Sequence, residues 1–112
     1  MPPGPKKRKR RVDRLYVIYK ITCKPTGETY IGVVVKDGTI HHTLYRRLYQ
    51  HVFRAGKLGK TWKLHERIRE YGGHQFKIEL IETCIGKVKA HEREMQLIKL
   101  YGMLNTHGVR GE

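Results

Sequence analysis

The feature that most constrains the fold is a pair of alternating, β-branched segments joined by a short turn. Residues 15–22 (LYVIYKIT) alternate with the period of a half-buried strand. The turn that follows contains Pro25, which pre-sets φ, and Gly27, which tolerates unusual backbone conformations. Residues 29–35 (TYIGVVV) are again rich in β-branched side chains. Residues 15–35 therefore predict an antiparallel hairpin.

The segment after the hairpin changes to helical periodicity. Residues 36–42 (KDGTIHH) predict a loop, and a helix is expected from Thr43, a residue type that favours the N-cap position. Four apolar residues share one face of this helix: Leu44, Leu48, Val52 and Ala55. We expect this face to pack on the sheet.

Three more elements follow along the chain. Residues 62–71 predict a second helix that a Gly-Gly pair ends, residues 76–82 (FKIELIE) predict a third strand, and residues 87–101 predict a last helix. The order β-β-α-α-β-α predicts an α+β fold, in which helices flank a small three-stranded antiparallel sheet. A chain of 112 residues has room for one such domain.

The charge of the chain narrows its partners. Lys and Arg number 24 against 10 acidic residues, for a net charge of +14. Residues 1–14 carry seven basic side chains and one acid, a net of +6, which leaves +8 for residues 15–112. We expect the first segment to be a disordered basic arm and the second to be the folded domain. Because both parts are basic, the charge points to a polyanion, and to nucleic acid first.

Other features exclude some classes of protein. No segment approaches the ~18 consecutive apolar residues of a membrane span. Cys23 and Cys84 form neither a disulfide framework nor a zinc site by themselves and are expected to be reduced. We expect a cytoplasmic protein. The basic run of residues 6–11 also resembles a nuclear-import signal, so the nucleus stays open as a second compartment.

One residue of the last helix is out of place for a purely structural role. A helical wheel predicts an apolar arc of Val88, Ala90, Met95, Leu97, Ile98 and Tyr101. Glu94 falls inside that arc, next to His91. A carboxylate that faces a core is costly unless it is paired or binds a metal ion. Glu94 is therefore either an edge residue paired with a basic neighbour or a functional carboxylate.

The first helix contains a second anomaly. Arg47 and His51 are four residues apart, so they lie on one side of the helix, at the border of its apolar face. Such a pair can direct a fixed cation and a titratable imidazole at one phosphate. The alternative is two solvated residues on a basic helix.

The hairpin supplies a third signal. If Thr22 pairs with Gly27 across the turn, Tyr19 faces Tyr30 directly on one side of the sheet. A cross-strand aromatic pair serves either packing or chemistry. Gly32 is unusual inside a β-branched strand, where a glycine lets a ligand or another backbone approach closely.

These residues together resemble the GIY-YIG nuclease superfamily, and the resemblance covers the chain from about residue 15 to residue 105. Val17-Ile18-Tyr19 stands in the place of the GIY motif, and Tyr30-Ile31-Gly32 is the YIG motif. Arg47 and His51 resemble the arginine and histidine of the family's first helix, and Glu94 resembles its metal-binding glutamate. The motifs occur in the family's order, and the terminal one is Leu104-Asn105.

The sequence departs from the family pattern at a few positions. Val17 replaces the first glycine of the GIY motif. The stretch before the first helix is longer than in compact members, so Arg46 competes for the role of the arginine. Some members use a further His or Lys before the second helix, and here Lys60, His41 or His42 are the candidates.

The resemblance implies hydrolysis of phosphodiester bonds with one metal ion. Glu94 would hold a single Mg²⁺ or Mn²⁺, and Tyr19 would orient or deprotonate the attacking water with help from the basic residues of the first helix. Tyr30 would position the phosphate or the water, and Arg47 would neutralise the developing charge. Asn105 would hold the site together by hydrogen bonds. The products would carry 5′-phosphate and 3′-hydroxyl ends.

The expected substrate is DNA, double-stranded in the first instance. The basic residues expected to contact it are Lys36, Arg46, Arg54, Lys60 and Lys63. Homing, restriction, repair and host-DNA degradation all stay open, as do nicking or double-strand cutting and a monomer or a homodimer. The main alternative is a non-catalytic basic module that binds nucleic acid. A zinc hydrolase is disfavoured, because His91-Glu92 lacks the second histidine of an HExxH helix.

Overall fold

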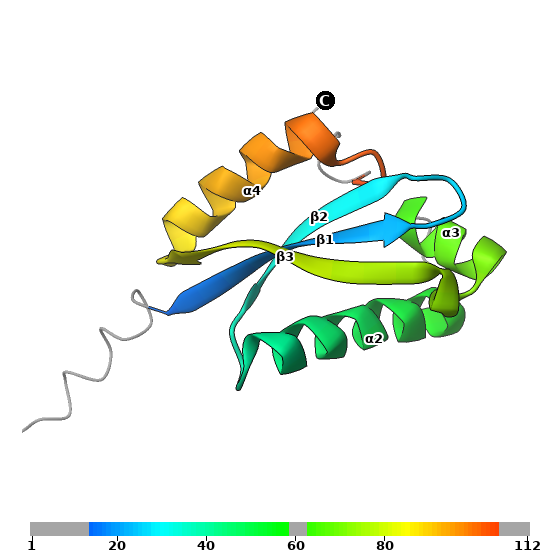
Figure 1. Cartoon of the computed structure of the whole chain (residues 1–112), viewed down its shortest axis with the longest axis horizontal. Helices are drawn as coiled ribbons and strands as arrows, with labels where there is room; N and C mark the ends of the chain where they lie inside the picture. The colour runs from blue at the N-terminus through cyan, green and yellow to red at the C-terminus, as the bar shows by residue number, and fades with distance from the viewer. Residues whose placement is uncertain (1–13, 59–62, 106–112) are drawn as a thin grey trace, which may run out of the picture.

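The computed structural model describes residues 14–58 and 63–105, so most of the expected basic arm and Lys60 lie outside the described residues. The elements in chain order are β1 (Leu15–Cys23), β2 (Thr29–Val35), α2 (Ile40–Leu58), α3 (Lys63–Tyr71), the 3₁₀ helix η1 (Gly73–Gln75), β3 (Phe76–Ile85) and α4 (Lys87–Tyr101). The fold is α+β, and its three-stranded antiparallel sheet has the order β2-β1-β3 (Figure 1). This arrangement confirms the predicted fold class.

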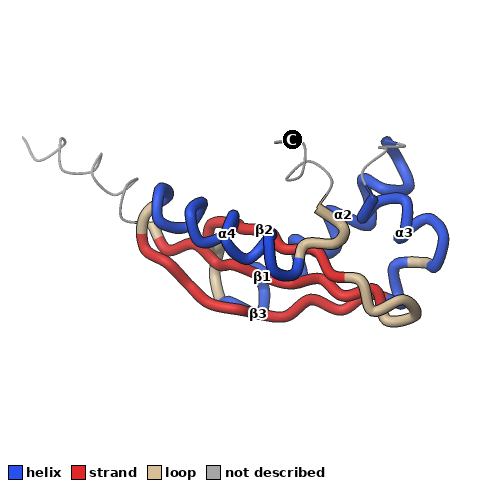
Figure 2. The backbone as a smooth tube through the Cα atoms, turned by 90° about the horizontal axis from the view of Figure 1, so that it is seen from above, coloured by secondary structure: helices blue, strands red, loops and turns tan. Residues whose placement is uncertain are grey.

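The sheet sends alternate side chains into two packed layers, as the period of a strand requires. The larger layer joins β1 to α2 and α3, and its buried members include Val17, Tyr19, Ile21, Leu44, Ala55, Leu64 and Ile68. The smaller layer lies under α4, where Ile18 and Ile31 pack with Leu97. α4 and α2 thus lie on opposite sides of the sheet (Figures 1 and 2). The predicted apolar face of the first helix is confirmed, since all four of its residues belong to the larger layer.

The register of the hairpin differs from the predicted one. Thr22 pairs with Thr29 rather than with Gly27, and Tyr19 therefore lies opposite Gly32 rather than opposite Tyr30. Gly27 has a φ of 78°, a left-handed conformation that belongs in a turn and not in a strand pair. The turn consequently takes up Gly27, and the register shifts by two residues, which keeps the two tyrosines on one face of the sheet.

The first helix begins earlier than predicted. Thr39, and not Thr43, caps α2, because its Oγ accepts a hydrogen bond from the backbone N–H of His42 at 3.0 Å. Thr43 lies inside the helix and is buried. Its Oγ accepts the N–H of Asp37 at 2.8 Å and donates to the carbonyl of Thr39 at 2.8 Å. Thr43 thus fixes the loop before the helix rather than the helix end.

The predicted buried arc of the last helix is wrong at three positions. Val88, Met95 and Tyr101 have 71%, 61% and 49% of their surface exposed, whereas Ala90 and Leu97 are buried. On a helical wheel, Val88 and Met95 lie opposite the line that joins Ala90 to Leu97, so one helix cannot bury both sides against a single sheet.

Two further features concern the described residues. Cys23, at the end of β1, and Cys84, near the end of β3, are both free. No described helix is long and apolar enough to cross a membrane.

Candidate active site

Tyr19 lies at the centre of the candidate site and has no exposed surface. β1 directs its ring toward α2, where the hydroxyl meets two side chains. The Nε–H of Arg47 donates to the Tyr19 oxygen at 3.2 Å, and His51 Nε2 lies 3.1 Å from that oxygen. Burial raises the pKa of the Tyr19 phenol, and the neighbouring Arg47 only partly offsets this rise. Tyr19 is therefore a neutral phenol at pH 7.

Gly32 makes room for Tyr19. A Cβ atom at position 32 would lie 2.3 Å from the Tyr19 hydroxyl oxygen and 2.4 Å from Cζ, distances that no side chain can occupy. The close approach expected at this glycine is thus made by the tyrosine of the neighbouring strand. On the other side of β1, the pairing with β3 shifts between Ile18 and Tyr19. Such a bulge is a common means of redirecting a side chain beside a functional site.

Tyr30 completes an aromatic cluster around the hydroxyl of Tyr19. Its ring centroid lies 6.4 Å from that of Tyr19 and 5.3 Å from that of His51, which it meets edge-on. Tyr30 is buried, and its pKa is raised by burial first and by Tyr19 second. The two tyrosines are diagonal neighbours across the hairpin rather than a directly facing pair.

Arg47 connects this buried cluster with the surface. Its Nη1–H donates to Oε1 of Gln50 at 3.0 Å while its Nε–H holds Tyr19. Burial alone would lower the pKa of Arg47, but Tyr19, Tyr30 and Glu94 outweigh that effect and raise it, so the guanidinium keeps its charge. Arg46 instead forms an exposed ion pair with Asp37 at 2.8 Å. Of the two arginines, Arg47 is the one that contacts Tyr19.

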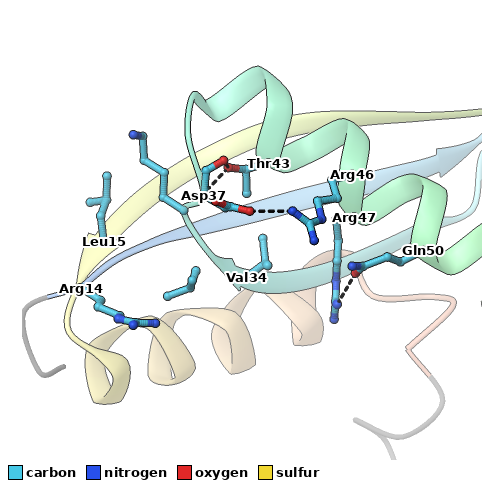
Figure 3. A pocket seen from close by; sticks show the side chains of 10 residues that line it. Arg14, Leu15, Val34, Asp37, Thr43, Arg46, Arg47 and Gln50 are labelled. Carbon is cyan, nitrogen blue, oxygen red and sulfur yellow. Dashed lines mark hydrogen bonds and ion pairs between the residues drawn. The ribbon is translucent and has the colours of Figure 1, made fainter.

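A groove of about 700 Å³ opens beside Arg47 (Figure 3). Its basic lining residues are Arg14, Lys36, Arg46 and Arg47, and its acidic one is Asp37. The groove follows the end of β2 and the first turns of α2, which are both labelled in Figure 1. Four cations around one cavity fit a phosphate-rich ligand.

Glu94 approaches the same cluster from the other side of the sheet. α4 packs chiefly on β2, the edge strand that carries Tyr30 and Gly32. The Glu94 side chain is 16% exposed, and its Oε1 lies 3.3 Å from His91 Nδ1. Its charge contributes to the raised pKa values of Tyr19, Tyr30 and Arg47. The carboxylate therefore acts electrostatically on the three residues with which the sequence motifs associate it.

Asn105 fastens the segment that follows α4 to the middle of β2. Its Oδ1 accepts the N–H of Ile31 at 2.8 Å, and its Nδ2–H donates to the carbonyl of the same residue at 2.7 Å. The amide thus substitutes for a neighbouring strand at an otherwise open edge. Asn105 is fully buried, and its partner Ile31 directly precedes Gly32 in β2. The two hydrogen bonds therefore stabilise the strand that backs Tyr19.

The remaining predicted residues divide according to their distance from the cluster. Arg54 is half-buried, and its charge lowers the pKa of Tyr19 and Tyr30 against the effect of burial. Lys63 is exposed at the start of α3 and acts on the Glu28 carboxyl instead. His41 and His42 are exposed in the first turn of α2, and His41 stacks edge-on against Tyr45. The structure gives neither histidine a contact with Tyr19.

Three residues near the site were missed by the sequence analysis: Arg14, Gln50 and His65. His65 is fully buried on α3, with its Nε2 3.3 Å from Nδ1 of His51. A helical wheel of residues 63–71 would have placed His65 at the edge of the arc of Leu64 and Ile68, which is the criterion that singled out Arg47 and His51.

The described residues offer a metal ion at most a partial set of protein ligands. Among residues 14–58 and 63–105, no group of three or more His, Cys, Asp or Glu side chains is arranged to hold a metal ion by itself. Mg²⁺ is commonly bound through one or two carboxylates, with water and substrate phosphate as its other ligands. Glu94 offers such an oxygen ligand at the edge of the cluster.

Comparison with known proteins finds no matching protein-family model, no matching curated protein and no matching solved structure. The function is therefore proposed from the residues, geometry and chemistry of the site.

Proposed function

We propose that this protein is a divalent-metal-dependent DNA endonuclease of the GIY-YIG type. The observation that carries the proposal is the position of Arg47, which lines the basic groove and also holds the hydroxyl of the buried Tyr19. A guanidinium in that position can receive a phosphate from the groove on one side and remain coupled to an acid–base group on the other.

The groove supports a nucleic-acid substrate. Arg14, Lys36 and Arg46 extend the positive surface away from Arg47, in a chain whose net charge is +14. Phosphates on either side of the one at Arg47 would pair with these side chains and displace counterions. Arg46 would then exchange Asp37 for a phosphate, a small cost because exposed ion pairs contribute little stability.

Tyr19 would deprotonate the attacking water after His51 has accepted the phenol proton. As a phenol of raised pKa, it cannot serve as a free tyrosinate at neutral pH and needs a base to accept its proton. His51 Nε2, 3.1 Å from the hydroxyl oxygen, is such a base. Because Tyr19 is fully buried, Arg47 would have to shift toward the groove before the attacking water could reach the Tyr19 oxygen. Arg47 then neutralises charge that develops on the phosphoryl oxygens.

Glu94 would bind one Mg²⁺ or Mn²⁺, which supplies Lewis-acid polarisation of the phosphate when it is bound. The rest of the site works through the chain's own groups. Tyr30 packs against His51 and limits its rotation, and Asn105 keeps β2 in register behind both tyrosines. Such packing around a catalytic group preserves its orientation.

The test is cleavage of supercoiled plasmid DNA with Mg²⁺. We expect Glu94→Gln to lower the rate by at least about 100-fold, because a neutral amide is a poor metal ligand. Glu92→Gln is the matched control, since this glutamate is exposed on the same helix and loses the same charge. Its rate is expected to stay within about twofold, as for other exposed substitutions. A chelator should abolish cleavage by the wild-type protein.

The competing function is a non-catalytic module that binds nucleic acid, which the basic groove also favours. Binding of DNA without cleavage, across linear, nicked and branched substrates, would establish that alternative. Equal cleavage by Glu94→Gln, Glu92→Gln and the wild-type protein would show a contaminating nuclease and remove the site assignment.

A further inference from the structure

Tyr19, His51 and His65 form a continuous chain of polar groups through the larger core layer. His51 Nε2 lies 3.1 Å from the Tyr19 oxygen, and His51 Nδ1 lies 3.3 Å from His65 Nε2. The two imidazole centroids are 5.6 Å apart. The exposed fractions of the three residues are 0%, 1% and 0%. β1, α2 and α3 thus contribute one residue each to a chain that is shielded from water.

The protons in this chain can be assigned from donors and acceptors. The Tyr19 oxygen already accepts the Nε–H of Arg47, and its own O–H, buried away from water, needs an acceptor. His51 Nε2 lies within reach and must then be unprotonated. A neutral His51 consequently carries its proton on Nδ1 and donates it to His65 Nε2. The orientation of one phenol proton thereby assigns the tautomers of both histidines.

Packing alone does not require a histidine at position 65. The neighbouring buried residues of α3 are Leu64 and Ile68, and a leucine in place of His65 would bury apolar surface without a polar group to satisfy. The imidazole offers an acceptor in the one direction in which His51 has a donor.

We propose that His65 is a positioning residue that holds His51 in the tautomer able to accept the Tyr19 proton. In free imidazole side chains, the form with hydrogen on Nε2 is preferred, and that form would direct a donor at Tyr19 instead of a lone pair. When Tyr19 transfers its proton, the O–H bond breaks and a bond to His51 Nε2 forms, giving a tyrosinate and an imidazolium. His65 then continues to accept from Nδ1. The catalytic consequence depends on the proposed nuclease function, whereas the tautomer does not.

The tautomer is measured first, by long-range proton–nitrogen NMR of the ¹⁵N-histidine-labelled protein without substrate. The signals of His51 are identified by their loss in His51→Gln. We expect the wild-type protein to carry hydrogen on Nδ1 of His51. In His65→Leu we expect Nε2–H to become the main form, and in His65→Gln, whose amide oxygen can accept from Nδ1, the wild-type form to return. Thermal unfolding of each variant confirms that it is folded.

Cleavage kinetics measure the consequence. His65→Leu should lower kcat by at least about tenfold with an unchanged KM, and His65→Gln should restore most of it. Hydrogen on Nε2 of His51 in the wild-type protein would overturn the proposal, as would a folded His65→Leu with wild-type tautomer. A changed tautomer with wild-type kcat would overturn the catalytic part. If the wild-type protein cuts no DNA, the proposed function fails, but the NMR result still decides the role of His65.

Discussion

The two faces of the sheet bury different kinds of side chain. The face under α2 and α3 encloses a polar chain, Tyr19, His51 and His65, inside the larger apolar cluster. The face under α4 has a smaller apolar cluster around Leu97, and Glu94 lies at its border. Buried polar groups cost free energy unless they are hydrogen-bonded. The first face accommodates them because its polar groups bond to one another in series.

This difference shows how a site with one carboxylate can be assembled. α2 supplies both the guanidinium of Arg47 and the imidazole of His51, but it contains no acidic residue that could supply the carboxylate. The carboxylate comes from the other face, on α4. The two sets approach each other at β2, because α4 packs chiefly on this edge strand, which also carries Tyr30 into the cluster with Tyr19 and His51. The proposed chemistry thus depends on the exact position of β2 relative to both layers.

Among the variants that test this comparison of the two faces, the largest effect is expected from Arg47→Lys, which removes the link between the groove and the α2 face. The planar guanidinium of Arg47 holds the Tyr19 oxygen and Gln50 at the same time. A single ammonium group cannot hold both. Single-turnover cleavage should slow by about 100-fold. Arg46→Lys is the matched control, because its side chain forms an exposed ion pair and should lose at most about threefold. A larger effect for Arg46→Lys would transfer the arginine role to that residue.

A smaller effect, on stability, is expected from Gly32→Ala, which forces the edge strand against Tyr19. The added Cβ would lie 2.3 Å from the Tyr19 hydroxyl oxygen, so urea unfolding should show a loss of about 1–3 kcal/mol. In a Tyr19→Leu background the same substitution should cost less, since the colliding atoms are gone. Additive losses in the double variant would contradict this explanation.

Gly56→Ala is the control for glycine replacement as such. Gly56 lies in α2 with no atom within 4 Å of an added Cβ. A helical Gly→Ala change without a clash should stabilise the protein by about 0.5–1 kcal/mol. The opposite signs at positions 32 and 56 would isolate the collision with Tyr19 as the cause of the loss.

Periodicity in the sequence was sufficient to predict the order of the elements and the apolar face of the first helix. The period of 3.6 in α2 is a consequence of packing on one side, and its predicted apolar face belongs to the larger layer as expected. In β1 the predicted face contributes Val17, Tyr19 and Ile21 to the larger layer, but Ile18 on the opposite face is buried under α4 as well. Glu94 was found for the same reason, because its place beside Ala90, between Tyr101 and Ile98 on the wheel, is a property of the helix alone.

The parts that could not be predicted depend on contacts across the chain. The register of the hairpin depends on the left-handed conformation of Gly27 in the turn. Short turns of different types place such a glycine at different positions, so the sequence alone left the register open. Val88 and Met95 are apolar but exposed, since α4 has only one sheet to cover it. The wheel position of His65 could have marked it, but its contact with His51, fourteen residues away in the chain, could not be predicted.

The smallest effect is expected for the ion pair between Glu28 of the hairpin and Arg67 of α3, on the side of the larger layer. Arg67 Nε donates to Glu28 Oε1 at 2.8 Å, and this bond, with the charge of Arg67, lowers the pKa of Glu28. A carboxyl whose pKa is lower in the folded state adds stability above its unfolded pKa and loses it as the pH falls through the folded pKa. Because the pair is partly exposed, Glu28→Gln should cost less than about 1 kcal/mol at pH 7. The difference in unfolding free energy between Glu28→Gln and the wild-type protein, measured with urea, should shrink below about pH 4.5, near the ordinary pKa of Glu. In an Arg67→Gln background the difference should be absent at pH 7. A cost that persists unchanged at pH 3 would mean that Glu28 supports the turn through packing and not through its charge.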